Sequence, residues 1–226
     1  MTFRDYSETP VPTTIAKSEP GRRRRAVYRH GVKRGLDIAF VIMTLPISVP
    51  LMLCMMCFVA LDGHMPIYRQ KRLGRGGRIF YLLKIRTMVP EADTLLEHHL
   101  SQNREARREW DETQKLKCDP RITRIGYFLR KSSLDELPQL WNVLKGDMSV
   151  VGPRPIMVDQ KALYPGKAYY EMRPGITGLW QVSERNETSF SERAEFDSRY
   201  SASLSLSQDV LILLRTVRVV LRGTGY

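Results

Sequence analysis

The longest hydrophobic stretch of this chain is a run of 24 residues, 38–61, that contains no charged side chain. As a straight helix it would reach roughly 36 Å, enough to cross the ~30 Å hydrocarbon layer of a bilayer. Pro46 and Pro50 stand near its middle with Ser48 between them, and two prolines so close together kink or break a helix. Each half is too short to cross alone, so the pattern predicts a helix, a break and a second helix.

Basic residues lie on both sides of this run. Seven Lys or Arg residues fall between Arg69 and Arg86, and a further group precedes the run. The positive-inside rule therefore places both ends of the segment, taken as residues 33–63, on the cytoplasmic face. This favours a re-entrant hairpin in one leaflet over a transmembrane span. The length of the run disfavours the third alternative, a buried helix of a soluble core.

Residues 1–32 are rich in Pro, Ser, Thr and Arg, show no apolar period, and are predicted to form a disordered basic arm. The net charge of +12 indicates a polyanionic partner such as nucleic acid, an anionic membrane or phosphorylated substrates. A basic cluster next to an apolar run suits the anionic lipids of an inner leaflet, although in isolation it would equally suit nucleic acid. Its members are Arg22, Arg23, Arg24, Arg25, Arg29, Lys33 and Arg34.

Residues 64–226 alternate between short strand-like and helix-like patterns, which predicts a single compact α+β domain, mostly helical with short strands. The C-terminal segment, 204–222, is apolar with arginines on one face and suits an amphipathic helix at the membrane interface. A helix docked on the core is the alternative for this segment. The other predicted elements are strands at 67–68 and 79–83 around a Gly-rich turn at 74–77, and helices at 90–117 and 192–200.

The three cysteines cannot form a full set of disulfides. Cys54 and Cys57 have C-x-x-C spacing, but they lie inside the apolar run without a histidine or a second pair, so they are taken as apolar residues rather than a redox or zinc site. The absence of a disulfide framework favours a reducing, cytosol-facing location.

Residues 130–146 contain the strongest candidate for chemistry. Ser133 and Glu136 have the spacing of a capping box, and Gly146 is a natural C-terminal stop, so the pattern predicts a helix that begins near Ser133. Asp135 and Glu136 would then lie at the helix N-terminus, where the dipole favours an ionised carboxylate that can serve as a nucleophile. A second carboxylate can hold a divalent cation or a proton. The alternative is that both residues only cap the helix. Its apolar face comprises Leu134, Leu137, Leu140, Trp141 and Leu144.

Arginine-rich loops surround this stretch in the sequence. Residues 119–130 precede it and would bring Arg121, Arg124 and Arg130 close to the carboxylates. Residues 147–155 end in a Pro-flanked turn that fixes Arg154, and a later loop ends in Arg185 and Asn186. Loops with many turn residues and arginines are common places for binding residues. Lys84 and Arg86 alternate with apolar neighbours, so both are expected on one face of a strand.

These motifs and their order closely resemble the bacterial sugar transferase family, the monotopic phosphoglycosyl transferases, over about residues 33–226. Within that family the chain looks most like the short exopolysaccharide-initiating enzymes, the ExoY-like undecaprenyl-phosphate galactose phosphotransferases. The motifs are the Pro-broken apolar segment, KIRTM at 84–88, SLDELPQL at 133–140, GPRP at 152–155, PGITGLWQ at 174–181, and RN at 185–186.

The resemblance implies a reaction and a location. Family members transfer a sugar-1-phosphate from a nucleotide diphosphosugar to undecaprenyl phosphate at the bacterial inner membrane, with the catalytic domain facing the cytoplasm. They release a nucleoside monophosphate and use Mg²⁺. By resemblance we expect UDP-galactose as the donor, with UDP-glucose as the alternative. Homo-oligomerisation stays open, and the lack of a nucleic-acid-binding motif disfavours nucleic acid as a partner.

The resemblance also implies roles for individual residues. Asp135 matches the nucleophile that forms a phosphosugar–aspartyl intermediate, and Glu136 matches its partner, with both near the metal. Pro50 matches the proline that breaks the re-entrant helix. The positions expected near the phosphates are Lys84, Arg86, Arg130 and Arg154, and those associated with the nucleotide are Arg185 and Asn186.

Two positions depart from the family pattern. Val49 stands where members often carry a serine before the proline, which puts the geometry of the break in doubt. Glu184 stands where the usual motif has a glycine, and a carboxylate close to a diphosphate is unfavourable unless it points away or meets the metal. An inactive, membrane-bound family member is therefore an alternative to the active transferase.

Overall fold

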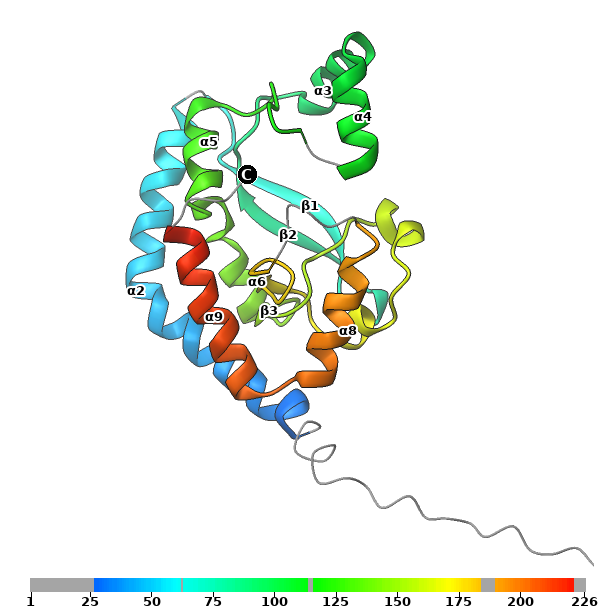
Figure 1. The fold of residues 1–226 in the computed structure, drawn as a ribbon. Coiled ribbons are helices and arrows are strands. Elements are labelled where there is room, and N and C mark those ends of the chain that lie inside the picture. Colours follow the sequence, from blue (N-terminus) through cyan, green and yellow to red (C-terminus); the bar gives the residue numbers. More distant parts are fainter. Residues whose placement is uncertain (1–26, 62, 114–115, 184–189, 222–226) are drawn as a thin grey trace, which may run out of the picture.

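The computed structural model describes residues 27–61, 63–113, 116–183 and 190–221 (Figure 1). Most of the predicted basic arm lies outside the described residues, as do Glu184, Arg185, Asn186 and Arg222. The end of the arm was predicted wrongly, because Tyr28–Val32 forms a π-helical turn that runs directly into the first long helix.

The described residues form a mixed helix and strand fold in which helices dominate, as the sequence predicts. Two small sheets lie at the centre, one antiparallel (β1–β2) and one parallel (β3–β4), with helices around them (Figure 1). The strands are β1 Ile67–Leu73, β2 Ile79–Ile85, β3 Ser149–Val151 and β4 Gly175–Thr177. The α-helices are α2 Lys33–Ala60, α3 Ala92–Gln102, α4 Arg104–Thr113, α5 Arg124–Lys131, α6 Gln139–Lys145, α7 Ala168–Glu171, α8 Arg193–Ser203 and α9 Leu206–Leu221.

The long helix α2 remains helical through Pro46 and Pro50, so the predicted break into two separate helices is not observed. Figure 1 shows α2 curving along one side of the domain, consistent with prolines that remove backbone hydrogen bonds and bend a helix. Its best 18-residue window has a mean hydropathy of 2.3, and only 11% of that window is buried. By length and composition α2 can cross a membrane, and its apolar surface faces outward rather than into a core.

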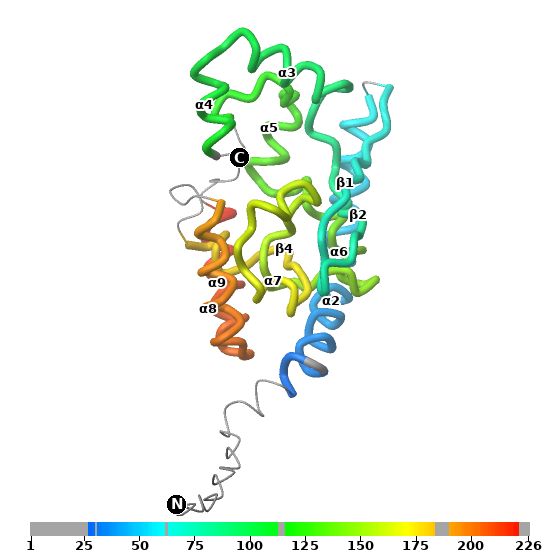
Figure 2. The backbone as a smooth tube through the Cα atoms, turned by 90° about the vertical axis from the view of Figure 1, so that its right-hand side faces the viewer, coloured from blue at the N-terminus to red at the C-terminus, as the bar shows by residue number. Residues whose placement is uncertain are grey.

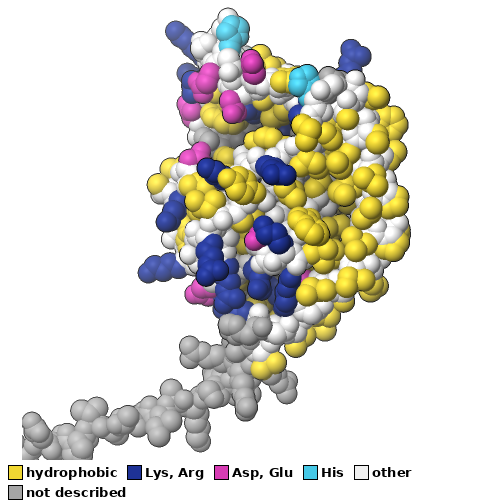
Figure 3. Space-filling view, turned by 180° about the vertical axis from the view of Figure 1, so that it is seen from behind, with side chains coloured by type: hydrophobic (Ala, Val, Ile, Leu, Met, Phe, Trp, Pro, Cys, Tyr) yellow, Lys and Arg dark blue, Asp and Glu magenta, His cyan; other side chains and the backbone are white. Residues whose placement is uncertain are grey.

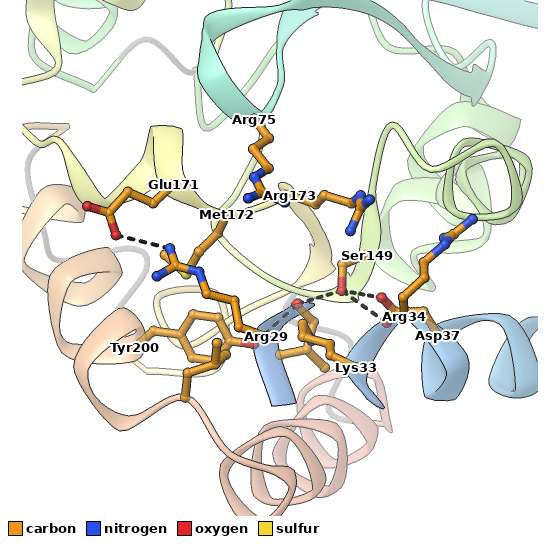
Figure 4. Close-up of a pocket in the computed structure, with 12 residues that line it drawn as sticks. Arg29, Lys33, Arg34, Asp37, Arg75, Ser149, Glu171, Met172, Arg173 and Tyr200 are labelled. Atoms are coloured by element: carbon orange, nitrogen blue, oxygen red, sulfur yellow. Dashed lines mark hydrogen bonds and ion pairs between the residues drawn. The ribbon is translucent and has the colours of Figure 1, made fainter. Parts of the chain in front are cut away.

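A buried polar network fastens the first turns of α2 to the rest of the fold (Figure 4). The Asp37 carboxylate accepts hydrogen bonds from the Ser149 hydroxyl (2.8 Å) and the Val150 backbone N–H (3.0 Å). Lys33 forms an ion pair with Asp209 of α9 at 2.6 Å. These bonds connect the start of α2 to both β3 and α9.

Two of the basic residues expected to face the lipid leaflet therefore point into the protein instead. Lys33 is neutralised by Asp209, and Arg34 donates to the backbone carbonyls of Val143 and Leu144 at the C-terminal end of α6. Carbonyls at a helix C-terminus lack intrahelical partners and carry partial negative charge, so a guanidinium there is stabilising. Arg173 adds a hydrogen bond to the Gly146 carbonyl at the same end (2.9 Å).

Helix α9 is docked on the core, which is the alternative stated for the C-terminal segment. It packs on β3 and β4 through the fully buried Ile212, and Thr216 hydrogen-bonds Thr177 of β4 at 2.7 Å. Its outer side remains apolar and exposed, for example at Leu214 and Val217. Figure 3 shows apolar side chains gathered along the side of the molecule formed by α2, with basic side chains concentrated near the start of that helix.

Helices α3 and α4 form a small layer of their own beyond the sheets (Figure 2). The predicted single helical stretch is interrupted at Asn103, whose side chain accepts from the backbone N–H groups of Glu105 and Ala106 and caps α4. Leu96 and Leu100 pack there with Ala106, apart from the main core.

Asn142 joins α6 to the β1–β2 hairpin. Its side-chain oxygen accepts from the Leu83 N–H (3.1 Å) and its amide donates to the Tyr81 carbonyl (2.8 Å), so the side chain pairs with β2 as a neighbouring strand would. It is 1% exposed. The bond fixes the position of β2, and with it Lys84, relative to α6.

We expect Asn142→Ala to lower the free energy of unfolding by about 2–3 kcal/mol, because it leaves a buried N–H and a buried carbonyl without partners. Asn103→Ala is the matched control, since it removes two hydrogen bonds at an exposed helix cap and should cost only about 1 kcal/mol. Thermal unfolding of both variants in detergent measures the difference. Equal losses would contradict the role assigned to Asn142.

A buried carboxylate also holds α8. Tyr164 donates a hydrogen bond to Asp197 at 2.5 Å, and Asp197 is 6% exposed. Burial raises the pKa of Asp197 to about 6, although the Tyr164 hydrogen bond and the charge of Arg193 act in the opposite direction. Between the ordinary value and pH 6 the folded chain keeps a proton that the unfolded chain has lost. Stability therefore falls as pH rises through this window.

Asp197→Asn should remove this pH dependence, because asparagine can accept the Tyr164 hydrogen bond without ionising. Relative to the unaltered chain, the variant should gain on the order of 3 kcal/mol of stability between about pH 4 and pH 7. Thermal midpoints across this range measure the effect. Asp111→Asn, at an exposed carboxylate on α4, should show no such trend; a parallel trend in both variants would refute the assignment.

Candidate active site

The two adjacent carboxylates lie where β2 meets the turn before α6. Lys84 of β2 donates to Asp135 at 3.2 Å and to Glu136 at 2.8 Å, so a single ammonium group bridges the pair. Asp135 is almost fully buried, with 6% of its side chain exposed, whereas 19% of the Glu136 side chain is exposed. Arg154 approaches Glu136 from the other side at 4.0 Å.

The local backbone differs from the predicted capping box. Ser133 has a left-handed conformation (φ 58°, ψ 18°), and its side chain makes no capping hydrogen bond. Leu134–Glu136 forms one 3₁₀ turn (η3), and α6 begins only at Gln139, after Pro138. The carboxylates therefore precede the helix instead of capping it. A non-glycine residue in this backbone region is uncommon and strained, and such strain is often found at functional sites.

The predicted apolar face is also only partly correct. Leu140 and Leu144 pack against the core as expected. Trp141, however, is 60% exposed. Because α6 begins only after Pro138, residues 134–137 are not part of the α-helix, and the apolar face predicted from helical spacing does not include them. Gly146 does end the helix with a positive φ of 90°, as the sequence predicts.

The electrostatics of Asp135 differ from the expectation of a helix-stabilised anion. Burial raises the pKa of Asp135 above the ordinary value for an aspartate. Lys84 lowers it, Glu136 raises it, and Arg130 lowers it. Desolvation disfavours the charged form, so the ionisation of Asp135 depends on nearby cations rather than on the dipole of α6.

Arg130 reaches this site from the last turn of α5. Its Nε donates to the Thr87 hydroxyl at 2.8 Å, and burial lowers its pKa while Asp135 raises it. Thr87 in turn follows β2, and its carbonyl accepts from the Thr123 N–H at the start of α5. A Cβ on Gly126 would come within 2.0 Å of that carbonyl, so only glycine allows α5 to lie this close.

Two other predicted arginines lie elsewhere. Arg86 donates to the Met65 and Val59 carbonyls, which fastens the end of α2 to the hairpin. Arg121 is bound by Asp119 at 2.6 Å and stacks on Trp110, so its guanidinium is committed there rather than to the carboxylates. Lys84, Arg130 and Arg154 are thus the predicted basic residues that the structure brings to the carboxylate pair.

The sequence did not single out Thr87, Arg72 or Arg193 as site residues. Thr87 lies inside the KIRTM motif, so its position was a usable signal. Arg72 of β1 and Arg193 of α8 lie near Arg154, and each feels the charge of Arg154. Nothing in local spacing relates three residues this far apart in the chain.

Protein side chains at this site can supply only part of the ligand set that Mg²⁺ requires. Within the described residues, no group of three or more His, Cys, Asp or Glu side chains gathers around one point. Asp135 and Glu136 are adjacent carboxylates. Mg²⁺ is commonly bound by one or two carboxylates with the remaining ligands supplied by substrate phosphates and water. The pair therefore fits a metal that arrives with a phosphorylated substrate.

A small pocket lies at the start of α2, away from these carboxylates (Figure 4). Its lining includes Arg29, Arg75 and Arg173, and Arg29 pairs with Glu171 at 3.0 Å. None of the predicted catalytic residues lines it. It belongs to the joint between α2 and the domain.

Residues 28–223 match the sequence model of the family described as bacterial sugar transferase. The chain is 49% identical over 196 residues to the undecaprenyl-phosphate galactose phosphotransferase of Salmonella typhimurium and 47% identical over 196 residues to the UDP-galactose-lipid carrier transferase of Erwinia amylovora. Each match covers 86% of this chain but 41% of the relative, so the chain spans about two fifths of their length.

A shorter relative matches over most of both chains. The exopolysaccharide production protein ExoY of Rhizobium meliloti is 43% identical over 196 residues, which is 85% of this chain and 87% of that protein. The family match covers more than half of the chain and includes every described site residue. The chain belongs to the bacterial sugar transferase family.

Proposed function

We propose that this protein transfers a sugar-1-phosphate from a UDP-sugar to undecaprenyl phosphate, releases UMP, and so begins an exopolysaccharide repeat unit. The observation that carries the proposal is the buried Asp135–Glu136 pair, bridged by Lys84 and flanked by Arg130 and Arg154. The name of the Salmonella relative supports undecaprenyl phosphate as the acceptor, and that of the Rhizobium relative supports a role in exopolysaccharide production.

In the first half-reaction, an oxygen of Asp135 attacks the phosphorus that carries the sugar. The bond between that phosphorus and the bridging oxygen breaks, and its electron pair leaves with UMP. In the second half-reaction, a phosphate oxygen of the polyprenyl phosphate attacks the same phosphorus and frees Asp135. Two steps through one nucleophile suit one soluble and one lipid substrate that need not bind together.

The surrounding residues would supply charge neutralisation and alignment, which is most of what phosphoryl transfer requires. Lys84 and Arg130 favour the ionised, nucleophilic form of Asp135, because both lower its pKa against the effect of burial. Arg154 lies close enough to Glu136 to bind a phosphate placed beside that carboxylate. Mg²⁺ held by Asp135 and Glu136 would neutralise phosphate oxygens. Arg185 and Asn186 are assigned to the nucleotide by resemblance.

The membrane placement follows from the apolar surface. Helix α2 exposes large apolar side chains on a 28-residue helix, and α5 and α9 add exposed apolar residues such as Phe128 and Leu214. We assign α2 to the bacterial inner membrane as a re-entrant segment, bent at Pro46 and Pro50, with the catalytic residues at headgroup level on the cytoplasmic face. Anionic inner-leaflet lipids would meet the four consecutive arginines, 22–25, that precede the helix in the sequence.

UDP-galactose is the first candidate donor and UDP-glucose the second, because two close relatives are named for galactose. The competing function is an inactive family member, motivated by Glu184. The intact carboxylate pair and its bridging lysine favour an active enzyme.

Asp135→Asn should abolish UMP release, by about 10³-fold or more, because it removes the nucleophile while keeping its shape. The assay uses the full chain in detergent with Mg²⁺, undecaprenyl phosphate and either UDP-galactose or UDP-glucose. Glu195→Gln, at an exposed ion pair on α8, is the matched control and should keep full activity. If the folded unaltered chain releases no UMP from any UDP-sugar, the transferase proposal fails.

Membrane topology can be tested with cysteines at the two ends of α2. In a chain whose Cys54, Cys57 and Cys118 are replaced by serine, Leu36→Cys and Leu61→Cys introduce single thiols at exposed positions. Both should react with a membrane-impermeant maleimide from the cytoplasmic side, because basic residues flank both ends of the segment. A thiol at one end that reacts only from the periplasmic side would establish a span instead.

A further inference from the structure

Arg154, which lies 4.0 Å from Glu136, has two further arginines from distant parts of the chain near it. Arg72 of β1 donates to the Pro155 carbonyl at 3.0 Å, directly next to Arg154 in the turn after β3. Arg193, the first residue of α8, stacks its guanidinium over Trp180 at 4.1 Å and over Phe190 at 4.7 Å. A strand and a helix thus each contribute one guanidinium group to the surroundings of Arg154 in the turn.

Within the described residues, two of these side chains carry buried donors that form no hydrogen bond. The Nε atoms of Arg72 and Arg193 are inaccessible to solvent, and neither has a hydrogen-bond partner among the described residues. A buried, unsatisfied donor on a charged group is costly, and native proteins contain few of them. Such donors in two neighbouring arginines indicate an interaction that a bound ligand completes.

The charges of these arginines also indicate an anion-binding site. Burial, together with the charge of Arg154, lowers the pKa of Arg72 to about 10 and that of Arg193 to about 9. Arg72 also lowers the pKa of Arg193, so the three cations repel one another. Asp197 is the buried carboxylate that acts on Arg193 in the opposite direction. Like charges held this closely in a partly desolvated site are stabilised when an anion binds among them.

We propose that Arg72, Arg154 and Arg193 form the binding site for the diphosphate of the nucleotide-sugar donor, with Arg72 and Arg193 on the phosphate that departs with the nucleoside. This inference rests on the proposed function and assigns two residues that neither the motifs nor the comparisons single out. Arg154 links the two ends of the site, because it lies both 4.0 Å from Glu136 and within reach of the other two charges.

The reaction fixes the orientation of the diphosphate. The phosphorus that carries the sugar must face Asp135, so the second phosphate extends past Arg154 toward α8. When the bond to the bridging oxygen breaks, that oxygen keeps the electron pair and the departing nucleoside monophosphate gains one negative charge. Two arginines already in place at that position stabilise this charge without reorganising, which is the most effective form of electrostatic catalysis.

The location favours the soluble donor over the lipid acceptor as the source of the phosphate. Among the described residues, large exposed apolar side chains are most numerous on α2, α5 and α9. A few others lie on β1, β2 and α6, and none lies on α8, where Arg193 begins the helix. A lipid phosphate would approach from the apolar side. A nucleotide would approach from the side of α8.

The test measures UMP binding to the full chain in detergent, without lipid and without turnover. Arg193→Gln and Arg72→Gln should each weaken UMP binding by about 10-fold to 100-fold, as expected when a charge-assisted contact to phosphate is lost. Arg199→Gln is the matched control, because Arg199 lies on the same helix, stacks on Phe196 at 4.6 Å and pairs with an exposed carboxylate. It should bind UMP as the unaltered chain does.

A second variant protects the test against misfolding. Arg193→Lys keeps the charge but cannot present two donors to one phosphate, so it should fold and still weaken UMP binding. UMP affinity within about twofold of the unaltered chain in the folded Arg72 and Arg193 variants, or an equal loss in Arg199→Gln, would overturn the assignment. A selective loss of undecaprenyl phosphate binding would also overturn it, in favour of the lipid as the source.

The outcomes separate this inference from the proposed function. If the unaltered chain binds UMP through these arginines but releases none from a UDP-sugar, the binding site stands and the transferase function fails. If UMP is released normally and the variants bind it normally, the function stands and the arginine site fails. If the unaltered chain does not bind UMP, the arginine site fails as well.

Discussion

Two adjacent carboxylates, one of them almost completely buried, are unfavourable in a protein interior unless cations stand close to them. In this protein the compensation comes from three segments: Lys84 from β2, Arg130 from α5, and Arg154 from the turn after β3. Each segment is held by its own contact. Asn142 fixes β2, Thr87 holds the Arg130 side chain, and a rigid Pro-flanked turn presents Arg154. The hairpin, α5 and the parallel strands must therefore all be in place before Asp135 can exist as an anion.

The same balance of buried charge joins the apolar helix to the catalytic domain. Asp37 is satisfied by Ser149 and the β3 backbone, and Lys33 is neutralised by Asp209 of α9. Tyr28 and Tyr200 also donate hydrogen bonds to the Asp209 carboxylate. The network therefore includes α8 and the π-helical turn that precedes α2. Helix α2 therefore cannot move relative to β3 and α9 without exposing buried charges. An apolar helix fixed in this way sets the depth of the site relative to a membrane.

Local patterns in the sequence were sufficient for the elements whose stability is local. The β1–β2 hairpin, α8 and the Gly146 helix stop follow from alternation, helical spacing and a glycine where φ is positive. The capping box failed because spacing cannot distinguish a helix start from a left-handed turn followed by a proline. The continuity of α2 through two prolines was missed because sequence rules state the penalty of a proline but not the surroundings that absorb it.

The candidate site divides in the same way. Asp135, Glu136 and Lys84 lie in motifs, and the structure brings the three side chains together. The destination of Arg34 and Arg121 depended on tertiary contacts, since each found a local or distant acceptor that no spacing encodes. The sequence did not identify Arg72 and Arg193 as site residues for the same reason.

In the proposed reaction, one nucleophile serves two substrates of opposite character. Exposed apolar side chains on α2, α5 and α9 offer a surface to the lipid, whereas the proposed diphosphate site is formed by arginines of β1, of the turn after β3 and of α8. A lipid phosphate and a nucleotide sugar can therefore reach the same carboxylate from different directions. In the proposed reaction, departure of UMP would remove the negative charge from the proposed arginine site, while the phosphosugar would remain on Asp135. The acceptor then meets a site whose cations are free again, which favours entry of the second phosphate only after the first product has left.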